Sequence, residues 1–89
     1  MKKIDYKVES GKLLRLDVEF KGELISEIKI SGDFFIYPNS AICEIEAFLV
    51  NKNINHIEKL LDDFIKENGY RIIGFNSSDL KDAIYKTLD

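Results

Sequence analysis

Few side chains of this 89-residue sequence combine into a group that could do chemistry. His56 is the only histidine and Cys43 the only cysteine, so the chain alone cannot supply a Cys/His zinc site. We expect His56 to be a surface or helix-capping residue, and Cys43 to pack as a small hydrophobe rather than act as a reactive thiol. Asp62 and Asp63 are adjacent on an expected helix and diverge by about 100°, so they cannot act as a carboxylate pair. The sequence therefore predicts no catalytic residue and no metal site.

Residues 10–12 read Ser-Gly-Lys and faintly resemble the end of a phosphate-binding loop. The rest of the G-x-x-x-x-G-K-[ST] spacing is missing, and Leu13 stands where the hydroxyl residue should be. We therefore do not expect a nucleotide-binding loop. Lys12 lies at an expected hairpin tip that projects outward, so it is a candidate for contacting a phosphate held by another protein. The alternative is a solvated turn lysine.

The least self-explanatory stretch is 28–38. It begins as an alternating strand and breaks at Ser31, Gly32 and Asp33, where glycine permits a turn or a close backbone approach. Four large apolar residues then follow: Phe34, Phe35, Ile36 and Tyr37. They cannot all point to one face of a strand, so some must point into a cavity, a second layer or another chain. Two interpretations stay open: a bulge or turn with core aromatics, or an edge that faces a partner.

Bulk properties exclude several classes of protein. The net charge is −3 with a pI of about 5.1, and both signs are interleaved, which argues against nucleic-acid binding. No apolar run approaches the ~18 residues of a membrane span, and the charged N-terminus lacks the core of a signal peptide. The single cysteine fits a reducing cytoplasm. We expect one cytoplasmic domain, residues 1–89, that binds neither membrane nor nucleic acid.

Three strands are expected at 4–9, 13–20 and 24–30. The second alternates most cleanly, with Leu14, Leu16, Val18 and Phe20 on one face. Turns at 10–12 and 21–23 each contain a glycine, so the strands form an antiparallel meander with one dry face. Ile25 and Ser26 blur the register of the third strand.

Helical spacing dominates after Pro38, which suits the first turn of a helix. The pattern predicts helices at 41–49 and 55–68, a short strand within 70–75, and a last helix running to Leu88. Asn53 or Asn55 would cap the second helix, Asn55 with Glu58 as a capping box, and Ser77 or Ser78 would cap the last. Gly69 would stop the second helix. The order βββααβα is an α+β fold in which helices pack on one face of a small sheet.

The strand from the Gly-Lys-Leu of 11–13 to Glu19, and the segment Ile28 to Phe35 followed by Pro38, resemble the C-terminal accessory domain of bacterial lipoate–protein ligases. The similarity continues through the helices and the Ile-Ile-Gly-Phe of 72–75, so it covers nearly the whole chain. These 89 residues contain no counterpart of the large catalytic domain of such ligases. The resemblance therefore implies the small subunit of a two-component, or split, lipoate–protein ligase.

In this family, lipoate and ATP give lipoyl-AMP, and the lipoyl group then passes to a lysine of a lipoyl domain. The resemblance implies a non-catalytic accessory subunit that supports the first step. It would form a heterodimer with a catalytic subunit that binds ATP, Mg²⁺ and lipoate, and the isolated chain would be inactive and bind no cofactor.

The resemblance marks the segments at which we expect the catalytic subunit to be contacted: Gly11, Lys12, Ser31, Gly32, Asp33, Phe34 and Phe35. Lys12 is the candidate for the phosphate side. The alternative function is a free-standing α+β binding or scaffold module, for example in sulfur or iron–sulfur metabolism. That alternative requires an exposed, reactive Cys43.

Overall fold

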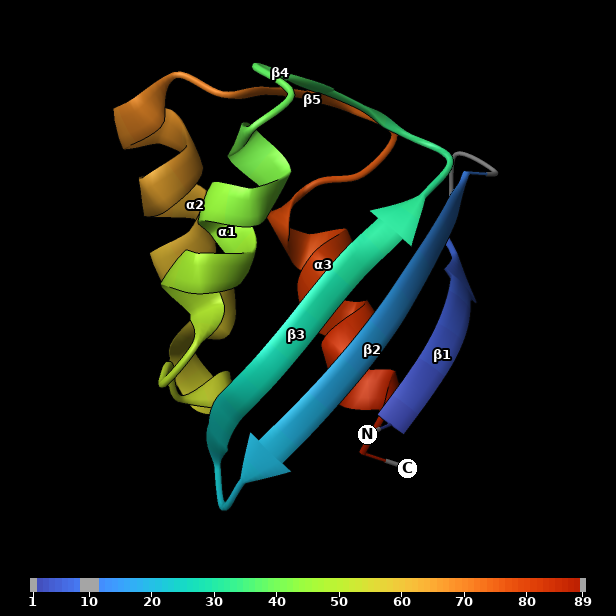
Figure 1. Cartoon of the computed structure of the whole chain (residues 1–89), viewed down its shortest axis with the longest axis vertical. Helices are drawn as coiled ribbons and strands as arrows, with labels where there is room; N and C mark the ends of the chain where they lie inside the picture. The colour runs from blue at the N-terminus through green and yellow to red at the C-terminus, as the bar shows by residue number, and fades with distance from the viewer. Residues whose placement is uncertain (1, 9–11, 89) are drawn as a thin grey trace.

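Three antiparallel strands form the main sheet of the computed structural model, which describes residues 2–8 and 12–88 (Figure 1). The strands are β1 (Lys2–Lys7), β2 (Leu13–Lys21) and β3 (Leu24–Gly32), in the spatial order β1-β2-β3. The expected meander is confirmed. Strand β1 begins earlier than expected and β3 runs two residues further, to Gly32. The expected end of the first strand at Glu9, and the turn residues Ser10 and Gly11, lie outside the described residues.

Strand β2 alternates as predicted, because Leu14, Leu16 and Val18 are buried between more exposed neighbours. A β-bulge explains the blurred register of the third strand. Phe20 pairs with Ile25 while Glu19 pairs with Glu27, so Ser26 is left without a partner across the ladder. The bulge keeps both Ile25 and Ile28 in the core.

The helices α1 (Ala41–Leu49), α2 (Ile57–Asn68) and α3 (Ser77–Lys86) cover the dry face of the sheet (Figure 1). Helix α1 packs against β3, α3 against β1 and β2, and α2 against the other two helices. The buried side chains between these layers form one core. The predicted α+β architecture, with its helices on one face of a small sheet, is confirmed.

Several helix ends differ from the prediction. Helix α1 starts three residues after Pro38, which instead accepts a turn hydrogen bond from the Ala41 amide (2.9 Å). Asn53 caps a short 3-10 helix, η1 (Ile54–His56), that leads into α2. The expected capping box at Asn55 does not form, because the Asn55 side chain donates to the Glu23 carboxylate instead (3.2 Å).

Of the other predicted helix ends, the one at Gly69 is confirmed and those of the last helix are not. Gly69 ends α2 in the left-handed conformation, as predicted (φ 66°). Helix α3 is capped by Asn76, which forms a reciprocal capping box with Asp79, rather than by a serine. Ser77 is instead the first residue of the helix and is buried. Helix α3 ends at Lys86, so the prediction that the last helix runs to Leu88 was two residues too long, and Leu88 is 41% exposed.

A second, two-stranded sheet lies at one end of the molecule (Figure 1). Strand β4 (Phe35–Tyr37) pairs antiparallel with β5 (Arg71–Ile73). The short strand within 70–75 was expected, but its pairing with residues directly after the Ser31–Asp33 break was not. Among the helices of the described residues, none has the length and apolar character needed to cross a membrane.

Candidate functional site

A close backbone approach joins the Ser31–Asp33 break to the start of β2. The Asp33 amide donates to the Leu13 carbonyl (2.8 Å). Gly32 has φ +141°, and a Cβ built on it would lie 2.1 Å from the Leu13 carbonyl oxygen. Only glycine fits here without displacing the backbone. This contact brings two of the predicted segments, Lys12 and 31–35, together.

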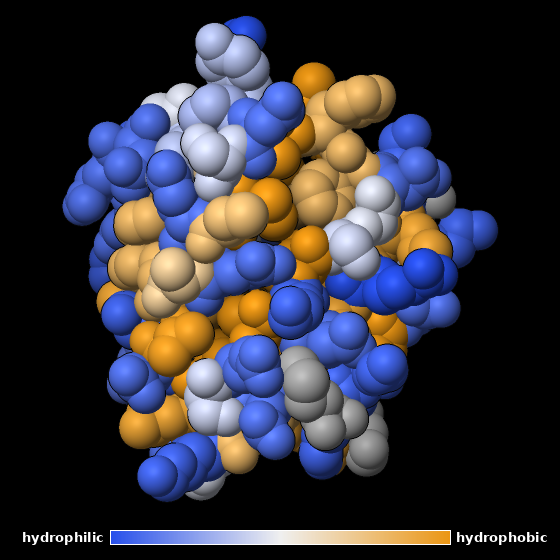
Figure 2. All heavy atoms as spheres, viewed as in Figure 1, coloured by the Kyte–Doolittle hydropathy of each residue, from blue (hydrophilic) through white to orange (hydrophobic). Residues whose placement is uncertain are grey.

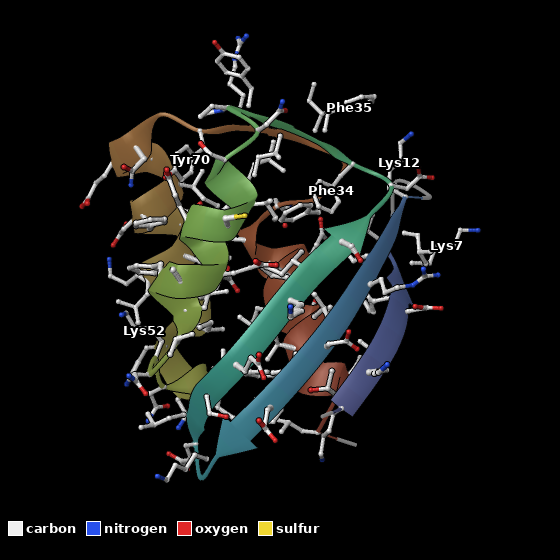
Figure 3. All side chains as sticks on the ribbon, in the orientation of Figure 1. Lys7, Lys12, Phe34, Phe35, Lys52 and Tyr70 are labelled. Carbon is white, nitrogen blue, oxygen red and sulfur yellow. The ribbon has the colours of Figure 1, made fainter. Side chains whose placement is uncertain are left out.

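Lys12 is exposed at the start of this arrangement. The Val8 amide donates a hydrogen bond to the Lys12 carbonyl (2.8 Å), which links the residue after β1 to the residue before β2. Lys7 and Lys12 lie at the same end of the molecule as Phe34 and Phe35, and Lys52 lies toward the opposite end (Figure 3). The structure therefore places a cationic side chain beside the aromatic segment. Gly11 lies outside the described residues.

The apolar run after the break divides between two directions, as its length predicted. Phe34 and Ile36 are partly buried against the core, and the Phe34 ring meets the edge of Phe75 at 4.9 Å between centroids. Phe35 and Tyr37 point outward and are 75% and 71% exposed. The first pair anchors β4, and the second pair is left to solvent.

Strand β5 completes the outward surface. Ile73 lies opposite Phe35, and Arg71 lies opposite Tyr37, so these four side chains share one face. We call this surface, made of Phe35, Tyr37, Arg71 and Ile73, the β4–β5 face. Hydrophobic side chains are visible at this end of the molecule and also over the side where α1 lies, whereas the outward face of the main sheet is mostly hydrophilic (Figure 2).

The β4–β5 face holds the three most exposed large hydrophobic side chains of the described residues. Ile73 is 67% exposed, whereas the others outside this face, Leu24, Tyr85 and Leu88, reach only 38–41%. A shallow hollow of about 490 Å³ lies over the face and is also lined by Ile36 and Asn39. Of this face, the sequence singled out only Phe35. Tyr37 belonged to the same apolar run, but nothing local indicated that Ile73 and Arg71 lie beside it.

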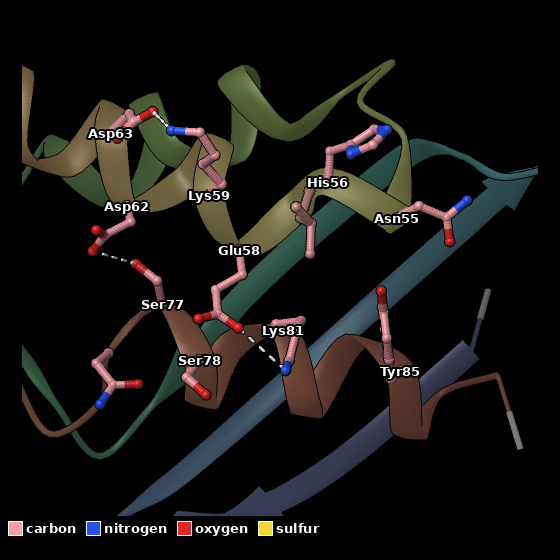
Figure 4. Close-up of a pocket in the computed structure, with 12 residues that line it drawn as sticks. Asn55, His56, Glu58, Lys59, Asp62, Asp63, Ser77, Ser78, Lys81 and Tyr85 are labelled. Atoms are coloured by element: carbon pink, nitrogen blue, oxygen red, sulfur yellow. Dashed lines mark hydrogen bonds and ion pairs between the residues drawn. The ribbon is translucent and has the colours of Figure 1, made fainter.

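A larger groove of about 740 Å³ runs between α2 and α3, but most of its charged side chains already pair with one another (Figure 4). Lys81 pairs with Glu58 (3.2 Å), Lys59 pairs with Asp63 (3.2 Å), and Ser77 donates to Asp62 (3.3 Å). These contacts tie one helix to the next or support a single helix, so we interpret the groove as a solvated seam. Asp62 and Asp63 are engaged separately, as their divergence predicted.

Neither His56 nor Cys43 builds a reactive centre. His56, the last residue of η1 and the N-cap residue of α2, is exposed and makes no side-chain capping bond. Cys43 is exposed on α1, so the expectation that it packs as a small hydrophobe was wrong. Within residues 2–8 and 12–88, no three metal-binding side chains cluster. An exposed thiol meets one condition of the sulfur-scaffold alternative but provides no second group for such chemistry.

Two comparisons relate the chain to known proteins. It is 33% identical over 63 residues to lipoate-protein ligase A subunit 2 of Thermoplasma acidophilum, which covers 71% of this chain and 66% of that protein. It also matches a chain in the structure of an archaeal lipoylation system from the same organism, a bi-partite lipoate protein ligase and its E2 lipoyl domain. That match has a TM-score of 0.79 and 30% identity, and covers 91% of this chain and 90% of the other. No protein-family model matches the chain.

Proposed function

The chain belongs to the family of lipoate–protein ligase A subunit 2, and from this we propose that it acts with a separate catalytic subunit in the activation of lipoate. In that reaction lipoate and ATP give lipoyl-AMP and pyrophosphate, before the lipoyl group passes to a lysine of a lipoyl domain. The chain is the non-catalytic member of the pair. The catalytic subunit binds lipoate, ATP and Mg²⁺.

The observation that carries this proposal is the extent of the structural likeness. The match has a TM-score of 0.79 and spans 91% of this chain and 90% of the related chain. The likeness therefore concerns nearly the whole fold of both chains rather than a short motif, which supports the proposal together with the similarity to subunit 2. A catalytic subunit is then the partner that the proposed reaction requires.

The chemistry of adenylation explains how such a subunit can help without supplying a catalytic group. A carboxylate must approach the α-phosphate of ATP, so the reactants need orientation and exclusion of water. A small rigid domain that covers the site supplies both and biases the closed state. The lipoyl-AMP must then reach a protein lysine, so the cover has to be removable, which suits a separate subunit with a modest interface.

We place the contact with the catalytic subunit at the end of the molecule that holds Lys12 and residues 31–35. The Leu13–Asp33 backbone bond holds these segments together, so they can meet the partner as one surface. Lys12 is the proposed phosphate contact, because its exposed ammonium can reach an anion held by the other subunit. Gly11 adjoins Lys12 in sequence and remains part of the proposed surface.

Reconstituted lipoylation tests this function. The catalytic subunit of the same organism is incubated with lipoate, ATP, Mg²⁺ and a lipoyl domain, and the mass of the lipoyl domain is followed with and without this chain. Modification is expected only when both subunits are present. A parallel reaction supplied with synthetic lipoyl-AMP should need the chain much less. Equal lipoylation from ATP with and without the chain would contradict the proposal.

A further inference from the structure

We propose that the β4–β5 face is the surface on which the catalytic subunit docks, an inference that rests on the proposed function. Phe35 and Ile73 would form its apolar centre, with Tyr37 and Arg71 beside them. This assigns the main contact to two strands far apart in the sequence, one of which, β5, was not among the segments expected at the interface.

The backbone under the face is fixed before any partner arrives. Ile36 and Ile72, the inward residues of β4 and β5, pack against the core. Phe34, the residue directly before β4, packs against Phe75. The outward side chains therefore project from a supported two-stranded sheet, and docking requires little ordering of the backbone. Such preorganisation favours binding because less conformational entropy is lost.

The size of the face suits the centre of an interface but not a whole one. Fully burying an aromatic side chain removes about 150–250 Å² of surface. Phe35, Tyr37 and Ile73 together would then contribute on the order of 400 Å², about half of the ~800 Å² per partner in a standard complex. The remaining area must come from neighbouring surface. Phe35 directly follows the Ser31–Phe34 segment, so docking here would also bring Lys12 to the rim.

The composition of the face indicates the chemistry of its partner. Aromatic residues and arginine are enriched at the centres of protein interfaces, and energetically dominant residues are often of these types. Within residues 2–8 and 12–88, the Arg71 guanidinium makes no hydrogen bond or ion pair. The partner surface should therefore present apolar side chains to Phe35 and Ile73, and a carboxylate that Arg71 can bind through two parallel hydrogen bonds.

A second copy of this chain fits the face less well. A two-fold dimer would set the same surface against itself, so it would bring the cationic Arg71 and Lys12 of both copies into one interface. Like charges brought together at an interface oppose association. A different subunit can instead offer the complementary charge. Under the proposed function, the catalytic subunit is that different partner.

Binding to the catalytic subunit, measured by isothermal titration calorimetry, tests the inference. The variant Phe35→Ser/Ile73→Ser should bind about 30-fold more weakly or worse, because both residues sit at the expected centre of the contact. The matched control Leu24→Ser/Leu88→Ser removes two exposed hydrophobic side chains outside the face and should bind like the wild type. Circular dichroism and denaturant unfolding confirm that each variant is folded, as expected for exposed positions.

Arg71 provides a second, independent variant. Arg71→Glu should weaken binding more than Arg71→Ala, since reversal adds repulsion to the loss of the ion pair. Equal binding of the wild type, Phe35→Ser/Ile73→Ser and Arg71→Glu would overturn the docking surface while leaving the proposed function intact. A wild-type chain that fails to bind the catalytic subunit would overturn both. Self-association of the free chain that is lost in Phe35→Ser/Ile73→Ser, with subunit binding unchanged, would assign the face to a second copy.

Discussion

Single residues at the end of the molecule that holds the β4–β5 face have separable roles. Lys12 is exposed and makes its described backbone contact only through its carbonyl, so its side chain is available to a partner. Phe34 and Phe35 are neighbours in sequence but differ in environment, one packed against Phe75 and the other 75% exposed. Substitution at each position should therefore affect a different measurement.

Replacing Lys12 with alanine should lower the rate of lipoyl-AMP formation roughly tenfold, which corresponds to the loss of one charge-assisted contact. Binding to the catalytic subunit should remain measurable, because the apolar face is intact. Lys21→Ala is the control, since it removes the same charge from the opposite end of β2. An unchanged rate of lipoyl-AMP formation in Lys12→Ala would refute the phosphate contact.

Replacing Phe34 with alanine should lower the free energy of unfolding by about 2–3 kcal/mol, because its partly buried ring packs edge-on against Phe75. Phe35→Ala should change it by no more than about 0.5 kcal/mol, since the side chain is mostly exposed. Urea unfolding followed by circular dichroism measures both. Similar losses for the two variants would show that Phe35 also belongs to the core.

Between elements, two contacts hold β4 and β5 against the rest of the fold. The first is the passage of Gly32 beside the Leu13 carbonyl, which joins the β1–β2 hairpin to the start of β4. The second is the hydrogen bond from the Tyr70 hydroxyl to Glu44, which joins α1 to the residue before β5. Both contacts fix the sheet that carries the proposed docking surface.

Gly32→Ala should destabilise the chain by roughly 2 kcal/mol or more, because its Cβ would clash with backbone and because φ of +141° strains any other residue. Gly22→Ala is the comparison. It also has positive φ (+63°), but an added Cβ would meet nothing within 4 Å, so the cost should be about 1 kcal/mol. Denaturant unfolding compares them. A smaller loss at Gly32 than at Gly22 would contradict the close approach.

The hydrogen bond to the Glu44 carboxylate raises the pKa of Tyr70 to about 12. Because the folded-state pKa lies above the ordinary value of 10.0, this stabilisation is fully present below pH 10 and is lost as the pH rises through about 12. Ultraviolet titration of the phenols should therefore show one late-ionising tyrosine, absent in Tyr70→Phe. Glu44→Gln should shift that ionisation to lower pH. A late phase that persists in Tyr70→Phe would assign it to another tyrosine.

For the whole molecule, the sequence predicted those features that arise from local periodicity. Alternation in residues 13–20 and helical spacing after residue 40 gave the meander, the helices and their order, because each pattern reports which face is buried. Helix caps were less predictable, since several polar residues compete for each end. The Asn55 side chain does not cap a helix but donates a hydrogen bond to the Glu23 carboxylate, a contact that depends on the tertiary fold.

The candidate site was predictable only in part, because half of it comes from a distant strand. The run after Gly32 indicated that some aromatic side chains must point away from the core, and Phe35 does. The pairing of β4 with β5 is non-local and involves three residues on each strand, too few to produce a clear alternation. Cys43 was predicted to be packed, but it is exposed. Helix geometry could have indicated this, because Cys43 lies about 200° around the helix from the buried Ala41.

Lipoate-dependent exchange between ATP and labelled pyrophosphate tests the central claim most directly, because it reports lipoyl-AMP formation without a lipoyl domain. The catalytic subunit is assayed alone, with this chain, and with Phe35→Ser/Ile73→Ser. We predict exchange only with the wild-type chain at concentrations near its dissociation constant, and recovery with the variant at a higher concentration. Equal exchange by the catalytic subunit alone would contradict the account, since the chain would then have no part in activation.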